Sequence, residues 1–311
     1  MSGSAIQRRK WLAGGLAATV AAIGAAGWAM RRWQAAEARA DWLRIERTST
    51  LRVGYAVEAP YAYVAPDLRI TGESPEMARW VASALGVERI EWVQVHFAQL
   101  IPDLLSARFD VIAAGLFVNE NRARRVAFSL PTLRVRSGLL LRGDRMDQRG
   151  ETRDWVLNSS RPLAVLAGSV EVERLLAWGV PRERLTLVPD ARTGYLAVLQ
   201  GRADGLALSW PTTRWMAVQR SSVPLIAVPV QLAPTAAGRP VTPVSLPDTD
   251  EAAFAFRPQS EELRQRWNAV LGPVLGTPAH LAVVAPFGFS AAELGRPPAS
   301  LSAVGLRGGG T

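Results

Sequence analysis

Short apolar runs of the kind found in buried strands alternate along the chain with segments whose apolar residues recur at helical spacing. Strand-like runs cover residues 51–55, 90–95, 110–115, 136–143, 162–169, 185–189 and 205–209. Helix-like segments cover residues 72–86, 97–109, 170–178, 194–201 and 261–271. The first of these helices has Pro75 near its start, Gly86 at its end, and Met77 and Val81 on one face. The alternation predicts an α/β fold built from two α/β units.

The second half of the chain contains a segment that departs from this alternation. Residues 222–250 are rich in proline and short polar side chains, which predicts an irregular segment that returns the chain to the first unit. A strand-like run at 252–258 follows it. The glycine-rich end of the chain, residues 296–311, is expected to form a flexible tail.

The N-terminal region has the pattern of an export signal. Residues 11–30 form an uncharged run directly after Arg8-Arg9-Lys10, as in a basic region followed by an apolar region. The stretch 7–12 resembles a twin-arginine motif in which Trp11 replaces the usual Phe. We therefore predict that residues 1–40 are an export signal and that the protein is periplasmic. An uncleaved membrane anchor is the alternative, because twenty helical residues span about 30 Å.

Composition excludes several classes of site and partner. The 311 residues include no cysteine and only His96 and His280, so thiolate chemistry, disulfides and a histidine-rich metal centre are ruled out, and no cofactor is expected. The formal net charge is +9, but residues 1–49 carry eight basic and three acidic side chains, which accounts for +5 of it. In the remaining chain acidic and basic residues are interspersed, so no nucleic acid partner is expected.

The order and spacing of several strings indicate a family. LRVGY at 51–55, GESPEMARWVASALG at 72–86, the segment 100–115 and NENRARRVAFS at 119–129 together resemble the family 3 extracellular solute-binding proteins of bacterial ABC importers. Within that family, EAPYAY at 58–63, GESPE, FAFRP at 254–258 and residues 278–294 are most similar to the ectoine and hydroxyectoine-binding proteins.

The resemblance implies a two-lobed periplasmic binding protein fold of type II, with a doubly wound sheet in each lobe and two crossing hinge strands. Lobe 1 would comprise residues 50–142 plus 251–295, and lobe 2 residues 143–250. The ligand would bind between the lobes. The partners implied are a small zwitterionic ligand and an ABC permease in the inner membrane, with the protein itself a monomer.

Arg122 is the first candidate site residue. It follows the strand-like run 110–115 and lies near the start of a helix, where a guanidinium and unpaired helix amides can together bind a carboxylate. The resemblance assigns the ligand carboxylate to this arginine. Asn119 stands where relatives usually have Thr, so both a ligand contact and a plain helix cap remain open for it.

Three aromatic residues follow strand-like runs: Tyr61, Phe97 and Phe117. Each alone would be expected in the core, but strand carboxyl ends line the ligand crevice of a doubly wound sheet. Together they predict an aromatic box for a delocalised cation. Glu58, in the same loop as Tyr61, would neutralise that cation.

Ser209 indicates which class of ligand the site would bind. Amino-acid-binding relatives commonly have Asp at this place, five residues after the position of Asp204, to bind the ligand ammonium. The replacement of this Asp by Ser209 favours a compact zwitterion whose positive charge is spread over a ring, as in ectoine. Ser169 and Asp190 open helices in lobe 2 and are predicted either to contact the ligand or to cap those helices, and Trp210 and Thr212 are further candidates.

Two other functions remain as alternatives. A polar amino acid or a betaine could replace ectoine as the ligand, and the same fold also carries a periplasmic dehydratase. Glu58 could act as a general acid, but the sequence contains no G-x-S-x-G, HExxH or P-loop motif, and no second catalytic group is evident. We therefore predict a binding protein that is not an enzyme.

Overall fold

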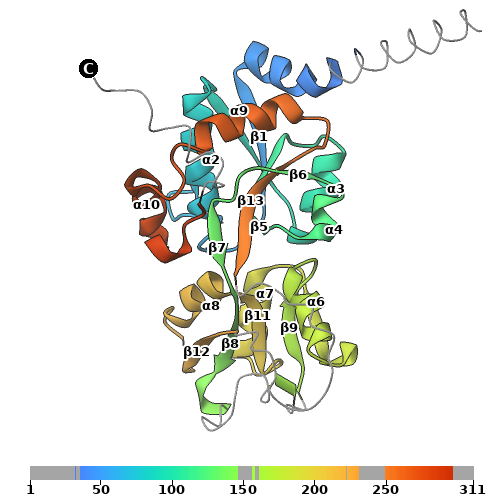
Figure 1. Cartoon of the computed structure of the whole chain (residues 1–311). Coiled ribbons are helices and arrows are strands. Elements are labelled where there is room, and N and C mark those ends of the chain that lie inside the picture. The colour runs from blue at the N-terminus through green and yellow to red at the C-terminus, as the bar shows by residue number, and fades with distance from the viewer. Residues whose placement is uncertain are drawn as a thin grey trace, which may run out of the picture.

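Two β-sheets, each flanked by helices, form two lobes (Figure 1). The computed structural model describes residues 32, 36–145, 156–157, 161–221, 223–230 and 249–296. The uncharged run at 11–30, most of the segment 222–250 and the predicted tail beyond residue 296 therefore lie outside the described residues. The two-lobed α/β architecture expected from the sequence is confirmed.

The sheet of lobe 1 has the strand order β4-β1-β5-β13-β6, and β7 also pairs with β13. Its strands are β1 Thr50–Tyr55, β4 Arg89–Gln94, β5 Val111–Phe117, β6 Ala127–Phe128, β7 Leu133–Val135 and β13 Asp250–Phe256. β1 runs parallel to β4 and β5, whereas β13 is antiparallel to β5. The helices are α2 Glu73–Ala84, α3 Leu100–Leu105, α4 Glu120–Ala123, α9 Glu261–Leu271 and α10 Pro278–Val284, and β2 Tyr63–Val64 pairs with β3 Ile70–Thr71 as a small hairpin.

The sheet of lobe 2 has the order β10-β9-β11-β8-β12. Its strands are β8 Ser137–Arg142, β9 Leu163–Leu166, β10 Leu185–Val188, β11 Gly205–Ser209 and β12 Leu225–Pro229. The parallel strands β9, β10 and β11 are each followed by a helix, namely α6 Val170–Ala177, α7 Ala191–Leu199 and α8 Trp210–Ala217. The carboxyl ends of these strands therefore place three helix N-termini at one edge of the sheet.

The structure corrects several boundaries expected from the sequence. β8 pairs with β11 and β12, so residues 137–142 belong to lobe 2, and the chain crosses between the lobes beside Arg136 rather than near Gly143. β12 lies within the segment expected to be irregular. The segment expected as one helix at 97–109 is a 3₁₀ turn, Phe97–Gln99, followed by α3. α8 was not expected; it begins because the Ser209 side chain caps it and Pro211 suits the first helical turn.

A helix over residues 36–48 packs on lobe 1 and precedes residue 50, where the sequence placed the start of that lobe. Trp42 and Ile45 are buried, and Asp41 forms a 2.8 Å salt bridge with Arg257. Residues 36–40, which the sequence assigned to the export signal, therefore belong to this helix. Among the described residues, no helix is long and apolar enough to cross a membrane.

Candidate functional site

The loop between β1 and β2 holds two of the predicted residues, Glu58 and Tyr61. The backbone N–H of Tyr61 donates to the Glu58 carbonyl over 2.9 Å, which forms a tight turn. The first amides of α2, at Glu73 and Ser74, donate to the carbonyls of Pro60 and Tyr61 over 3.1 and 3.0 Å. Helix N-terminal amides have no partner within their own helix, so these bonds both complete α2 and fix the loop.

Gly115 in β5 has no side chain and therefore leaves room for the Tyr61 ring to pack against this strand. A Cβ at Gly115 would come within 2.2 Å of the Tyr61 ring, and its φ of +59° also favours glycine. The ring lies 5.6 Å from that of Phe289 and is almost completely buried. Burial raises the pKa of the Tyr61 hydroxyl well above its usual value. The nearby Ser209 hydroxyl acts in the opposite direction on this pKa, although among the described residues no group lies in hydrogen-bonding geometry with the Tyr61 hydroxyl.

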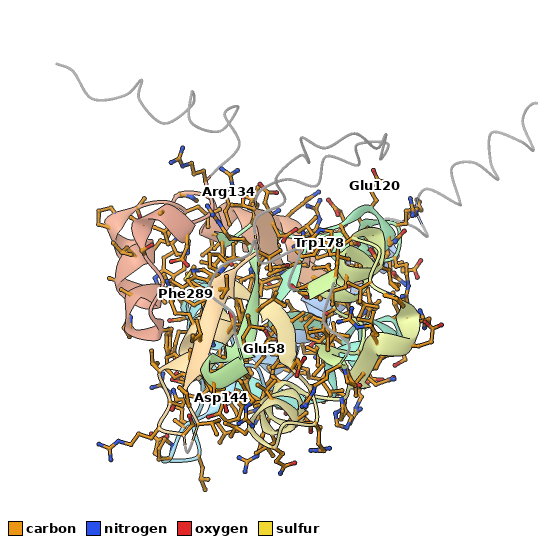
Figure 2. All side chains as sticks on the ribbon, turned by 90° about the horizontal axis from the view of Figure 1, so that it is seen from below. Glu58, Glu120, Arg134, Asp144, Trp178 and Phe289 are labelled. Carbon is orange, nitrogen blue, oxygen red and sulfur yellow. The ribbon has the colours of Figure 1, made fainter. Side chains whose placement is uncertain are left out.

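Seven of the nine predicted site residues line one small cavity between the lobes, of about 20 Å³. Lobe 1 contributes residues from a loop, a 3₁₀ turn, a strand and a helix, and lobe 2 contributes the residues that precede α6 and α8. The seven residues are Glu58, Tyr61, Phe97, Phe117, Arg122, Ser169 and Ser209. Glu58 lies near the middle of the molecule in Figure 2, with Phe289 and Trp178 on either side. The structure thus brings together residues that the sequence separates by up to 151 positions, from 58 to 209.

Asn119 and Asp190 lie beside this cavity rather than on its wall. The Asn119 side chain caps α4 by accepting from the backbone N–H of Arg122 over 2.8 Å, and it borders a neighbouring space shared with Phe97. The Asp190 side chain caps α7 by accepting from the N–H of Thr193 over 2.7 Å. It borders a second space, of about 230 Å³, that is also lined by Glu58. Both residues therefore act as helix caps here.

Arg122 links the two lobes at the cavity. Its side chain is 8% exposed, and it donates to the Phe117 carbonyl over 2.6 Å and to the Gly168 carbonyl of lobe 2 over 2.9 Å. Burial lowers the pKa of the guanidinium, whereas nearby carboxylates, Glu171 first among them, raise it. A guanidinium has five N–H groups, so these two bonds use only part of its capacity to donate.

Glu58 forms the second contact between the lobes at this cavity. Its Oε1 accepts from the Thr212 hydroxyl over 2.7 Å, and Thr212 in turn accepts from the Ser209 hydroxyl over 3.0 Å. Burial raises the pKa of the Glu58 carboxyl to about 7, and the hydrogen bond from Thr212 acts in the opposite direction by lowering it. A cation placed beside this carboxyl would favour its ionised form.

The three aromatic residues differ in how much of each ring the protein covers. Phe117 and Tyr61 are buried, whereas Phe97 is half-buried and packs against apolar residues of both lobes. The Arg122 guanidinium lies over the Phe97 ring, with its Cζ 5.6 Å from the ring centroid. The rings of Phe97, Phe117 and Tyr61 thus line the same space as the buried guanidinium, an arrangement that suits a flat or cyclic charged molecule.

Glu171 lines the cavity and was missed by the sequence reasoning. It lies in the first turn of α6, two residues after Ser169, and it is 4% exposed. Its Oε1 accepts from the Ser137 hydroxyl over 2.8 Å. The only signal in the sequence was its place in a helix that opens at a strand end, next to the candidate Ser169.

Further contacts between the lobes lie outside the cavity. The rings of Tyr63 in lobe 1 and Trp215 in lobe 2 are 5.7 Å apart. Arg214 of α8 donates to the Gly288 carbonyl of lobe 1 over 2.5 Å. Together with the bonds of Arg122 and Glu58, these contacts hold the two lobes against each other around the cavity.

Comparison with known proteins finds one family over most of the chain. The profile of the family described as "Bacterial extracellular solute-binding proteins, family 3" matches residues 51–274. "Probable amino-acid ABC transporter periplasmic-binding protein y4tE" of Sinorhizobium fredii is 29% identical over 227 residues, which cover 71% of each chain. "Cyclohexadienyl dehydratase" of Pseudomonas aeruginosa is 27% identical over 173 residues, 55% of this chain and 62% of that one.

Solved structures confirm the fold as the two-lobed type II architecture of periplasmic binding proteins. EhuB in complex with hydroxyectoine superposes with a TM-score of 0.67 at 24% identity, covering 80% of this chain and 91% of that one. The P235GK mutant of ArgBP from T. maritima has a TM-score of 0.67 at 22% identity, covering 79% of this chain and 97% of that one.

Proposed function

The chain belongs to the family 3 bacterial extracellular solute-binding proteins, and from this premise we propose that it captures a compact zwitterion of the ectoine or hydroxyectoine type. Proteins of this family serve ABC importers, so its partner would be an inner-membrane ABC permease that receives the ligand. The site of capture would be the periplasm, and the protein would act there as a monomer.

The cavity that joins Arg122 and Glu58 carries this proposal. Both side chains are at most 8% exposed, and within the described part of the chain neither forms a salt bridge. Buried charges in proteins are normally paired. A zwitterion supplies a carboxylate for Arg122 and a cation for Glu58, so one ligand would satisfy both groups.

The walls of the cavity favour a delocalised cation over a primary ammonium. The Ser209 hydroxyl is bonded to Thr212 and caps α8, and it carries no charge with which to hold an ammonium. Tyr61, Phe97 and Phe117 present aromatic surface instead, which attracts a cation whose charge is spread over a ring. Hydroxyectoine, which EhuB holds in the similar solved structure, is a molecule of this kind.

An amino acid is the second candidate ligand, because the relative from Sinorhizobium fredii is described as part of an amino-acid transporter. A thermal-shift screen of the purified protein with ectoine, hydroxyectoine, glycine betaine and polar amino acids separates the candidates. A ligand at 100 times its Kd stabilises the folded state by about 2.7 kcal/mol, so binding raises the Tm.

We expect ectoine or hydroxyectoine to give the largest rise in Tm. A rise with a polar amino acid alone would contradict the proposed ligand and leave the family assignment intact. Mass spectrometry of the incubated compound tests the enzyme alternative: the ligand should be recovered unchanged, and its conversion would show turnover.

A further inference from the structure

Glu171 is a second buried carboxylate on the cavity wall, contributed by lobe 2. Within the described residues it forms no salt bridge, although it is 4% exposed and shares the wall with Arg122, Tyr61 and Glu58. Its charge influences both neighbours, because it raises the pKa of Arg122 and also that of Glu58. A buried carboxylate without a cationic partner requires a positive charge or N–H donors nearby.

The bonds around Glu171 fix one of its oxygens. The Ser137 hydroxyl donates to Oε1 over 2.8 Å, and Ser137 itself accepts from Arg174. Arg174 also pairs with Asp250. Arg174 therefore donates to Ser137 and Asp250, and its contact with Glu171 runs through the Ser137 hydroxyl. Oε2 of Glu171 has no hydrogen bond within the described residues, so it is the oxygen left for a ligand.

These partners also tie Glu171 to both crossings between the lobes. Ser137 begins β8, directly after the first crossing, and Asp250 begins β13 in lobe 1. Asp250 pairs in register with Val135, the last residue of β7. Because Arg174 bonds both Ser137 and Asp250, the position of Glu171 depends on how the two lobes meet.

From this geometry we infer that Glu171 is a specificity-determining residue that binds an N–H of the ligand's cation from lobe 2, while Glu58 binds another N–H from lobe 1. The inference rests on the proposed function and narrows it to cations with two N–H donors. The amidinium of ectoine has one N–H on each side of its central carbon, so it can donate to two carboxylates at once. A quaternary ammonium such as glycine betaine has no N–H and can make neither bond.

Calorimetric titration of the wild-type protein and of Glu171→Gln with ectoine and with glycine betaine tests this inference. Truncating one member of a buried charge pair costs about 2–5 kcal/mol, so we expect Glu171→Gln to weaken ectoine binding on the order of 30-fold or more. The preference for ectoine over glycine betaine should fall in parallel. Glu173→Gln is the matched control, since it removes the same charge from an exposed position on the same helix and should change ectoine affinity less than about threefold.

Two results would overturn the inference. Equal ectoine affinity in the wild-type protein and Glu171→Gln would show that Glu171 has only a structural role. Equal losses of affinity in Glu171→Gln and Glu173→Gln would show that the effect comes from the change in overall charge and not from a contact with the ligand. If Glu171→Gln does not fold, Ser137→Ala gives the test. This change removes the hydroxyl that holds the Glu171 carboxylate, so it should weaken the binding of ectoine but not of glycine betaine. An unchanged ectoine affinity in Ser137→Ala would refute the inference. Failure of the wild-type protein to bind either probe would instead overturn the proposed function.

Discussion

Ligand binding should depend on pH through Glu58. Burial raises the pKa of this carboxyl to about 7, and a ligand cation beside it would stabilise the ionised form and bring its pKa back toward 4.5. Below pH 7 the protein must then lose a proton to bind. Affinity should therefore rise as the pH increases through about 7 and level off above it.

The size of the effect follows from the two pKa values. One unit of pKa difference between free and bound protein is worth about 1.4 kcal/mol, or a factor of about ten in affinity. For pKa values of about 7 and 4.5, binding at pH 5 should be roughly 70-fold weaker than at pH 8, and about 0.9 proton should be released per ligand at pH 6.

Calorimetry with ectoine in buffers of different ionisation enthalpy measures both the affinity and the protons released. Glu58→Gln should abolish the proton release and flatten the pH profile. Glu73→Gln is the matched control: Glu73 is also completely buried with a pKa raised to about 7, but it lies at the start of α2 and does not line the cavity. An affinity that is constant from pH 5 to 8 in the wild-type protein would refute this reasoning.

Four further predictions rest on the same contacts. Arg122→Ala should weaken ectoine binding by roughly 2–5 kcal/mol in calorimetry, and a near-native Kd would move the site elsewhere. Phe97→Leu and Phe117→Leu should each cost about 1–2 kcal/mol of binding free energy, and no loss in either would exclude a role for the ring faces. Since burial raises the pKa of Glu73 to about 7, the contribution of Glu73 to stability should be fully present below about pH 4.5 and be lost as the pH rises through 7. Glu73→Gln should therefore remove about 3 kcal/mol of the pH dependence of the unfolding free energy in urea denaturation, and identical pH profiles would contradict this. Deleting residues 1–48 should lower the Tm relative to deletion of residues 1–35, because the buried face of helix 36–48 contributes about 3–6 kcal/mol, and equal Tm values would make that helix dispensable.

Most of the longer strands could be predicted because their apolar runs are short and bounded by turn residues, whereas the short strands β2, β3, β6 and β7, and β12 in the proline-rich segment, were not predicted. The run at 136–143 predicted a strand but not its sheet, since an apolar strand with both faces buried fits either lobe. Only pairing with β11 and β12 places β8 in lobe 2. α8 was missed because its sequence, WPTTRWMA, contains Pro and two β-branched residues and has little helical character by composition.

The site residues that lie at the ends of strands could be predicted from the sequence. Tyr61 and Phe97 follow strands and Phe117 is the last residue of β5, and strand carboxyl ends meet at one edge of a doubly wound sheet, so local sequence was sufficient for them. Glu171 follows a strand too, but an acid in the first turn of a helix is usually solvated. Its burial depends on Ser137, 34 residues away, and on the packing of one lobe against the other.

A crystal structure of the protein with bound ectoine tests the central claim most directly, namely that one zwitterion satisfies the buried charges between the lobes. We expect the ligand carboxylate on the Arg122 guanidinium, its ring among Tyr61, Phe97 and Phe117, and an N–H of its cation donating to Glu58. Ectoine bound outside this cavity, or with its carboxylate away from Arg122, would contradict the account.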